Sequence, residues 1–190
     1  MNSFKKHIEK LSVLNPKDWE IVSKYLEKRV FSKKNKLLSI GQIEKYISFI
    51  DTGVVRLLIP NEDENKEITI GFSFQNEFIS AYDSFVSQTK SYYEVEALTN
   101  VSVWSISYKN LKEIYKSTHI GNIIGRKSFE RLLLIKSKRE ASFLNENAEQ
   151  RYLNLFSERP ELFKTIPLKY IASYIGITPQ ALSRIRRRIS

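Results

Sequence analysis

The most informative segment of the sequence for the fold is PLKYIASYIGITPQALSRIRRRIS, residues 167–190. Its apolar residues recur at spacings of three and four on both sides of a glycine, which predicts two short amphipathic helices. Gly176 supplies the permissive backbone that a tight interhelical turn requires. Thr178 is a good N-cap for the second helix, and Pro179 suits its first position, where a missing N–H costs nothing. The residues expected to form the core of this helix pair are Leu168, Ile171, Ala172, Ile175, Leu182, Ile185 and Ile189.

The opposite face of the second helix carries long hydrogen-bonding side chains, which suit base edges and phosphates. A small residue, Ala172, lets the two helices approach closely, and Leu182 fixes the second helix on the first. Together these features predict a helix-turn-helix that binds double-stranded DNA. An ordinary helical hairpin with a solvated basic face is the alternative. The predicted DNA contacts are Thr178, Pro179, Gln180, Ser183, Arg184, Arg187 and Arg188.

The composition is that of a globular chain of one or two domains, with 190 residues, 42% of them hydrophobic and 27% charged. No apolar run approaches the about 20 residues of a membrane span, and the N-terminus lacks a signal-peptide core. We therefore expect a cytoplasmic protein without a membrane partner. The net charge of +10 favours a polyanionic partner, and residues 176–190 hold four arginines and no acid.

Residues 3–11 have the pattern of a short amphipathic helix, and a second helix is predicted from Pro16, capped by Asn15. Short β-rich runs separated by turn residues follow, with no long helix between them. This spacing predicts an antiparallel barrel or jelly roll. The last two runs, joined at Thr99-Asn100, have the pattern of a hairpin. The six runs are 36–40, 46–50, 54–59, 67–72, 93–98 and 101–106.

A long helix is predicted over residues 120–144, and its apolar residues do not form a single stripe. Such a helix is buried on several sides. Packing on the barrel accounts for one face and a partner subunit for the other, which predicts a homodimer. Burial wholly within its own chain is the alternative. The predicted dimerisation residues are Ile120, Ile124, Leu132 and Ile135, while Phe129, Leu133 and Leu144 lie on another side.

The order of barrel, long helix and helix-turn-helix, with RYLNLFSERPELFKTIPLKYIASYIGITPQALSRIRRRI as its last part, resembles the Crp/Fnr family of bacterial transcription regulators. The closest likeness is to the short members found in Bacteroidetes-type bacteria. The resemblance implies an α+β fold with an antiparallel β-roll, a double-stranded jelly roll with flanking helices. It implies a cyclic-nucleotide-binding-like roll over residues 1–118, a long dimerisation helix over 119–145 and a helix-turn-helix domain over 146–190. The implied dimer would place two recognition helices in successive major grooves.

The recognition helix departs from the family pattern Arg-Glu-x-x-x-Arg, because the matching positions hold Pro179, Gln180 and Arg184. DNA binding therefore carries over, but the best-known target sequence of the family does not. Gln180 suits adenine and Arg184 suits guanine, and we expect these two to read bases. The sequence also ends directly after this helix, so we expect the β-wing of the family to be missing and some backbone contacts with it.

The effector region departs further. Family members that bind cyclic AMP use a Gly-Glu pair and, about ten residues later, an Arg-Ser pair for the ribose and the cyclic phosphate. The equivalent stretch here is residues 74–97, and no arginine occurs between Arg56 and Arg126. We therefore expect that cyclic AMP is not bound in the usual way. The protein either has no effector or binds an unknown small molecule, for which the candidate pocket residues are Ser80, Tyr82, Ser91 and Tyr92. The simpler interpretation is that these residues belong to the core or the surface of the roll.

No cofactor or metal is predicted. The chain has no cysteine and only two histidines, His7 on the expected exposed face of the first helix and His119 at the entry of the long helix. The iron–sulphur and haem sensors of the family would lack their usual ligands. An enzyme on a cupin-like jelly roll is disfavoured, because residues 28–107 contain no histidine. The remaining alternative is a ligand-binding module whose helix-turn-helix contacts a protein.

Overall fold

The computed structural model describes residues 1–63 and 66–189 of the chain. The chain divides into two compact units. Unit 1 comprises Met1–Leu57 and Phe72–Arg131, and unit 2 comprises Leu58–Gly71 and Leu132–Ser190. The long helix α5 (His119–Asn145) therefore contributes residues to each unit. The same holds for the strands β4 (Val55–Ile59) and β5 (Ile68–Ser73).

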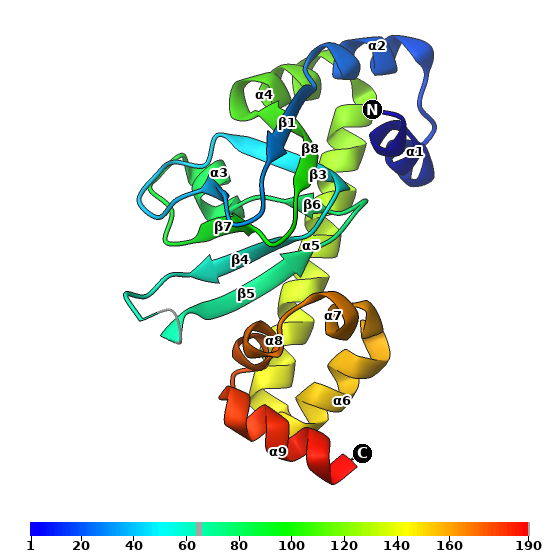
Figure 1. Ribbon diagram of the computed structural model, residues 1–190. Helices are drawn as coiled ribbons and strands as arrows, with labels where there is room; N and C mark the ends of the chain where they lie inside the picture. The colour runs from blue at the N-terminus through cyan, green and yellow to red at the C-terminus, as the bar shows by residue number, and fades with distance from the viewer. Residues whose placement is uncertain (64–65, 190) are drawn as a thin grey trace. The chain divides into compact units, whose positions relative to one another are not determined.

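Unit 1 is built on antiparallel strands, with sheet orders β1-β8-β3-β6 and β2-β7-β4-β5 among the described residues (Figure 1). This architecture agrees with the antiparallel barrel or jelly roll that the strand spacing predicted, and it confirms the α+β fold with a β-roll that the resemblance implied. The strands are β1 (Glu27–Phe31), β2 (Lys36–Leu38), β3 (Tyr46–Thr52), β4 (Val55–Ile59), β5 (Ile68–Ser73), β6 (Phe78–Ile79), β7 (Glu94–Ala97) and β8 (Val101–Ser107).

The predicted hairpin at Thr99-Asn100 is wrong, because β7 and β8 belong to different sheets. Between them, Thr99 Oγ1 accepts a hydrogen bond from the Val54 amide, and Asn100 Oδ1 accepts one from the Lys33 amide, both at 3.0 Å. The two side chains thus bind neighbouring loops at the point where the chain passes from one sheet to the other. The three-residue connection, 98–100, is short enough for either arrangement, so the sequence pattern did not distinguish them.

Helices cover the roll of unit 1, with α1 against β3, α4 against β8 and α2 against α4. Asn15 Oδ1 accepts from the Asp18 amide at 2.8 Å, which confirms the predicted N-cap of α2. Phe4, Phe49 and Phe78 pack edge to face, with centroids 5.3 to 6.1 Å apart. The helices of this unit are α1 (Asn2–Leu11), α2 (Pro16–Lys24), α3 (Tyr82–Ser87), α4 (Tyr108–Ser117) and the beginning of α5 (His119–Asn145).

The beginning of α5 belongs to the core of unit 1. Ile120 is only 2% exposed and packs in a cluster with Ile106 and Ile114, and Ile124 packs against the same cluster. Both side chains are therefore used within the chain, which corrects the expectation that they face a partner subunit. The physical reason is the short connection from α4, which brings the first turns of α5 onto the helix before it.

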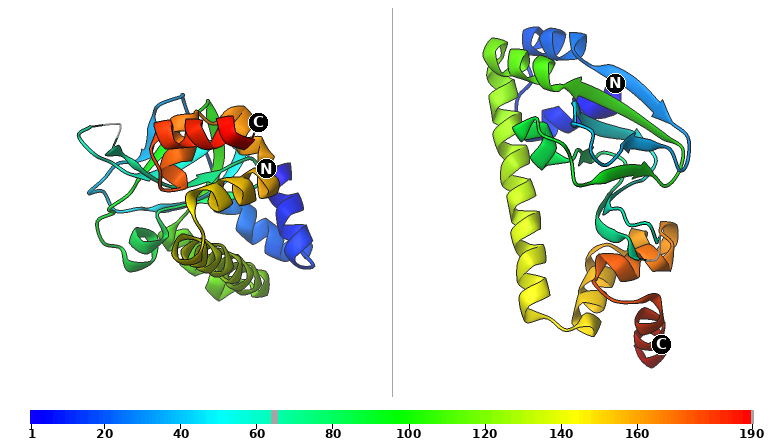
Figure 2. Two further views of the ribbon diagram at one scale, coloured as in Figure 1. Left: turned by 90° about the horizontal axis from the view of Figure 1, so that it is seen from below. Right: turned by 90° about the vertical axis from the view of Figure 1, so that its left-hand side faces the viewer.

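In unit 2, helices α6 to α9 follow the C-terminal end of α5 (Figure 2). They are α6 (Ala148–Glu158), α7 (Pro160–Thr165), α8 (Leu168–Tyr174) and α9 (Pro179–Ile189). Asn147 and Gln150 form a reciprocal capping box at the start of α6, and Pro160 opens α7. None of the helices in the described part of the chain has the length and hydrophobicity that a membrane span requires.

Candidate nucleic-acid interface and effector region

The helix pair α8–α9 has an apolar core between its helices. Ile171, Ala172, Ile175, Leu182 and Ile185 are all buried, as the spacing of the sequence predicted. Fully burying an aliphatic side chain contributes about 1.5–3 kcal/mol, so this short pair has a substantial core for its size. Leu168 and Ile189 are exposed, which corrects their assignment to the core. They stand at the first turn of α8 and the last turn of α9, the outer ends of the pair.

The turn between the helices is a Schellman motif. The Ile177 amide donates to the Ala172 carbonyl at 3.0 Å, and the Gly176 amide donates to the Ser173 carbonyl at 3.1 Å. Gly176 has a φ of +74°, in the left-handed region where glycine is favoured. Thr178 then begins α9, with its Oγ1 accepting from the Ala181 amide at 3.2 Å. The hydrogen bonds of the turn and of the Thr178 cap thus determine the direction in which α9 begins.

The seven predicted DNA contacts are all exposed, and all lie on α9 or its cap. Besides Thr178, whose hydroxyl caps the helix, two of them have partners within the chain. Ser183 Oγ donates to the Pro179 carbonyl at 3.0 Å, and the Arg188 guanidinium forms an ion pair with the carboxylate of Glu149 in the first turn of α6. Arg188 therefore has a structural partner that sequence reasoning did not foresee.

The charges of α9 suit a polyanion. The first turn carries no acid and the last turn carries Arg186, Arg187 and Arg188. Cations near the C-terminus of a helix are stabilised by its dipole, and the N-terminus, at Pro179, carries the positive end of that dipole. Phosphates are therefore favoured along the whole exposed face of the helix.

Residue Ser173 of α8 binds the segment of residues 58–71 that carries the end of β4 and the start of β5. Its Oγ accepts from the Thr69 amide at 2.9 Å and donates to the Glu67 carbonyl at 2.8 Å. Both groups belong to unit 2. A serine on a helix has no sequence signature for such a contact, since its partners lie more than 100 residues earlier in the chain.

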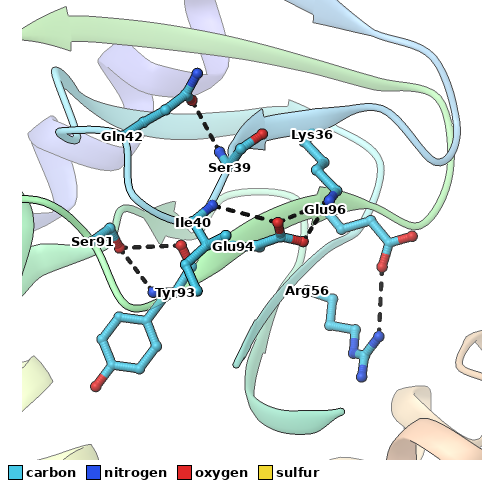
Figure 3. Close-up of polar contacts among 9 residues, drawn as sticks. All are labelled: Lys36, Ser39, Ile40, Gln42, Arg56, Ser91, Tyr93, Glu94 and Glu96. Carbon is cyan, nitrogen blue, oxygen red and sulfur yellow. Dashed lines mark hydrogen bonds and ion pairs between the residues drawn. The ribbon is translucent and has the colours of Figure 1, made fainter. Parts of the chain in front are cut away.

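The candidate effector residues of the roll are engaged by backbone groups or exposed. Ser80 Oγ donates to the Tyr46 carbonyl at 3.0 Å, and Ser91 Oγ accepts from the Tyr93 amide at 3.0 Å and donates to the Tyr93 carbonyl at 3.1 Å (Figure 3). Burial raises the pKa of the Tyr82 phenol, so this side chain stays neutral. Tyr92 is exposed. The hydroxyl groups of the two serines are thus already used within the chain, while Tyr82 and Tyr92 remain candidates.

Two acidic side chains of the same region, Glu94 and Glu96, have cationic partners. The buried Glu94 carboxylate accepts from Lys36 Nζ at 2.8 Å and from the Ile40 amide at 3.4 Å (Figure 3). Arg56, 1% exposed, lies with its Nη1 3.6 Å from Glu96 Oε2. A buried guanidinium requires such a partner, because burying an unpaired charge is very unfavourable. The arginine nearest in sequence to the effector stretch is thus already facing a carboxylate.

A further carboxylate, Glu44, lies at the start of α3. It accepts from the Tyr46 amide at 3.0 Å and from the amide of Ala81, the residue before α3, at 3.4 Å. Burial raises the pKa of Glu44, and the amide donors oppose that change. The amide that begins this helix therefore faces an acid of the same chain.

Neither histidine has the surroundings of a metal ligand. Within residues 1–63 and 66–189, no group of three or more His, Cys, Asp or Glu side chains could hold a metal ion. His7 is half-buried, with its ring 5.1 Å from Phe49 and 5.4 Å from Phe78, which corrects its placement on an exposed face. His119 is exposed at the first position of α5, as expected.

Comparison with known proteins supports the fold. Residues 28–118 match the family model of the cyclic nucleotide-binding domain. No curated protein matches the sequence. The c-di-GMP-responsive global regulator CLP of Xanthomonas campestris superposes with a TM-score of 0.70 at 15% identity, covering 92% of this chain and 91% of that one.

Two further solved structures agree. A protein from Eubacterium rectale described as a Crp/Fnr-family transcriptional regulator gives a TM-score of 0.69 at 17% identity, covering 92% of this chain and 83% of that one. FixK2 of Bradyrhizobium japonicum gives 0.69 at 15% identity, covering 86% and 84%. The resemblance to the Crp/Fnr family is thus confirmed at the level of the fold. The chain combines a segment that matches the cyclic nucleotide-binding domain family with the fold of the Crp/Fnr-type regulators.

Proposed function

We propose that the chain is a homodimeric transcription regulator of the Crp/Fnr type, not an enzyme, and that it reads double-stranded DNA with residues 178–189. The observation that carries this proposal is the division of α9 into two faces. Leu182 and Ile185 are buried against α8, while the polar and basic side chains are exposed with no acid among residues 176–189. A helix held in this way can enter a major groove with its outer face toward the bases.

The exposed side chains of α9 divide by chemistry. Gln180 and Arg184 have the donors and acceptors to read adenine and guanine, and Thr178, Ser183 and Arg187 suit phosphates. Arg188 suits a phosphate as well, but its ion pair with Glu149 must then open or be shared. We therefore assign the main phosphate contact at this end of the helix to Arg187.

The long helix supports a dimer. Beyond the core residues Ile120 and Ile124, its apolar side chains are largely exposed, and a concentration of exposed apolar residues is typical of an interaction site. Leu132 is half-buried and Ile135 exposed, so these two remain candidates for the partner face. The exposed apolar residues of α5 are Phe129, Leu133, Leu134, Ile135, Phe143 and Leu144.

The charged groups of the roll favour one of two possibilities: an effector other than cyclic AMP bound in the usual mode, or no effector. Its buried Arg56 faces Glu96, and its buried Glu94 faces Lys36, so the charged groups are compensated without a ligand. A cyclic phosphate would find no free arginine in the stretch from residue 74 to 97, which contains none. Calorimetry with cyclic AMP and cyclic GMP tests this, and micromolar affinity for either would contradict it.

The decisive experiment selects bound fragments from genomic DNA with the wild-type protein and then compares variants on those fragments. We expect Arg184→Ala to weaken binding by about 1–3 kcal/mol and to relax the base preference at one position of each half-site. Lys164→Ala is the matched control, since Lys164 is an exposed cation on α7. It should leave the base preference unchanged.

Two results would count against DNA reading by α9. One is wild-type protein that binds no DNA at low salt. The other is Arg184→Ala with unchanged affinity and base preference. In the first case, a helix-turn-helix that contacts a protein becomes the better interpretation. A salt series separates the two partners, because DNA binding weakens steeply as salt rises through counterion release.

A further inference from the structure

The turn of the helix-turn-helix is held by side chains from the end of α5 and from α6. Arg139 Nη2 donates to the Tyr174 carbonyl at 2.9 Å, and Arg151 Nε donates to the Ile175 carbonyl at 2.9 Å. These carbonyls lie at the end of α8, where the last four C=O groups of a helix have no partner within it. The two arginines thus bind the end of the helix that immediately precedes the recognition helix.

A single aromatic ring joins these contacts. Phe143 lies under both guanidinium groups, with its centroid 4.7 Å from Arg139 Cζ and 4.8 Å from Arg151 Cζ. The same ring packs on the turn, because a Cβ added to Gly176 would come within 2.6 Å of Phe143 Cε1. The absence of a side chain at Gly176 is therefore what lets α5 approach the turn.

Arg139 is the most constrained member of this group. Its guanidinium stacks on Phe143 and on Tyr174, at 4.0 Å from the second ring, while it donates to the Tyr174 carbonyl. Only a planar group with several donors can stack and donate at once, so lysine is not equivalent here. Burial lowers the pKa of Arg139, so its charge has an energetic cost where it lies.

We propose that Arg139 is a positioning residue for DNA recognition, which fixes the recognition pair relative to the C-terminal turns of α5. This inference rests on the proposed function. Arg139 and Phe143 are four residues apart, so both lie on one face of α5. In a dimer formed through α5, the separation of the two recognition helices then depends on this contact. A loosened contact allows α9 a wider range of positions, and the dimer tolerates a wider range of half-site spacings.

The experiment measures affinity for palindromic duplexes whose half-sites come from the wild-type selection and whose spacing is changed by one and two base pairs. The variants are Arg139→Gln, Arg139→Lys and the charge-matched control Lys164→Gln. Each is measured at several salt concentrations and at a temperature where thermal unfolding shows it to be folded. We expect Arg139→Gln to lose about tenfold in affinity at the best spacing, as for the loss of one charge-assisted hydrogen bond, and to discriminate poorly among spacings.

The salt dependence of binding distinguishes positioning from direct contact. Arg139→Gln should keep the wild-type salt slope, whereas loss of a phosphate contact lowers the slope by about 0.9. A lower slope, or a wild-type spacing preference in the folded variant, would overturn the proposal. If Arg139→Gln does not fold, Arg139→Lys decides: a broadened spacing preference supports the proposal and an unchanged one overturns it. Wild-type protein that selects no DNA defeats the proposed function itself, and this inference with it.

Discussion

At the scale of single residues, Gly176 combines two demands that only glycine meets. Its φ is +74°, and a Cβ there would clash with Phe143. Gly41 has nearly the same φ, +77°, but nothing lies within 4 Å of a Cβ added there. Substitutions at the two glycines therefore distinguish the cost of the left-handed backbone from the cost of the contact with Phe143.

We expect Gly41→Ala to lower the free energy of unfolding by about 1–2 kcal/mol, which is the cost of the left-handed conformation for a residue with a side chain. Gly176→Ala should lower it further, because Phe143 must also move. Urea denaturation followed by circular dichroism measures both values. Equal losses in the two variants would show that the contact between Phe143 and the turn contributes nothing to stability.

His7 predicts a dependence of stability on pH. Burial, and then the charges of Arg131 and Lys10, lower the pKa of His7 from its ordinary value of 6.5. The unfolded chain therefore binds more protons than the folded chain between the two pKa values, so stability rises with pH across that window and levels off above about 6.5. Below the pKa of His7 in the folded protein, this contribution to the free energy of unfolding is completely lost.

The measurement is the free energy of unfolding from pH 5 to 7.5 in the wild type and in His7→Gln, which cannot titrate. The variant should lack the rise that the wild type shows on approaching pH 6.5. His119→Gln is the control for the loss of one histidine, because His119 is exposed on α5. Identical profiles for His7→Gln and the wild type would contradict the assignment.

At the scale of elements, the Ser173 hydroxyl group links the helix pair to Glu67 and Thr69. Ser173 Oγ is the acceptor for the amide of Thr69, a residue that is 0% exposed. Removing this acceptor leaves a buried donor without that partner, which typically costs about 1–3 kcal/mol. The hydrogen bond between Thr69 and Ser173 is thus expected to contribute measurably to the stability of unit 2.

We expect Ser173→Ala to lower stability by that amount and to speed hydrogen exchange of the Thr69 amide. Ser183→Ala is the matched control: its hydroxyl is exposed and bonds to Pro179 on its own helix, so its removal should change stability by less than about 0.5 kcal/mol. Unchanged exchange at Thr69 in Ser173→Ala would show that the amide has another acceptor in solution.

At the scale of the whole molecule, the proposed dimer depends on the apolar side chains that α5 exposes. Leu134 is 71% exposed on this helix, and Val86 is 70% exposed on α3. The two positions are equally accessible, but only the first lies on the proposed interface. A charge placed in a dimer interface loses its hydration, whereas the same charge elsewhere on the surface does not.

We expect Leu134→Glu to weaken self-association at least about tenfold, equivalent to 1.4 kcal/mol, and Val86→Glu to leave it unchanged. Sedimentation equilibrium over a range of concentrations measures both. A wild-type protein that stays monomeric throughout would contradict the dimer. Equal association of the wild type and Leu134→Glu would place the interface away from this residue.

Elements with local signals could be predicted from the amino-acid sequence alone. The Asn15 and Thr178 caps, the glycine turn and the apolar spacing of Ile171, Leu182 and Ile185 depend on residues within a few positions of one another. Helix propensity, capping and amphipathic periodicity act over that range, so these features were predicted correctly. The six predicted strand runs were found for the same reason, whereas β1 and the two-residue β6 were not predicted.

The contacts between elements became known from the three-dimensional fold. It assigned β7 and β8 to different sheets, placed Ile120 in the core of unit 1, and paired Arg56 with Glu96 across 40 positions of sequence. It also brought Arg139 and Thr69, from two separate earlier parts of the chain, to the helix-turn-helix. Contacts between distant segments depend on how whole faces pack, and a single residue type carries no record of its distant partner. The helix over residues 179–189 was therefore evident in the sequence, while the contacts that hold it depend on the fold.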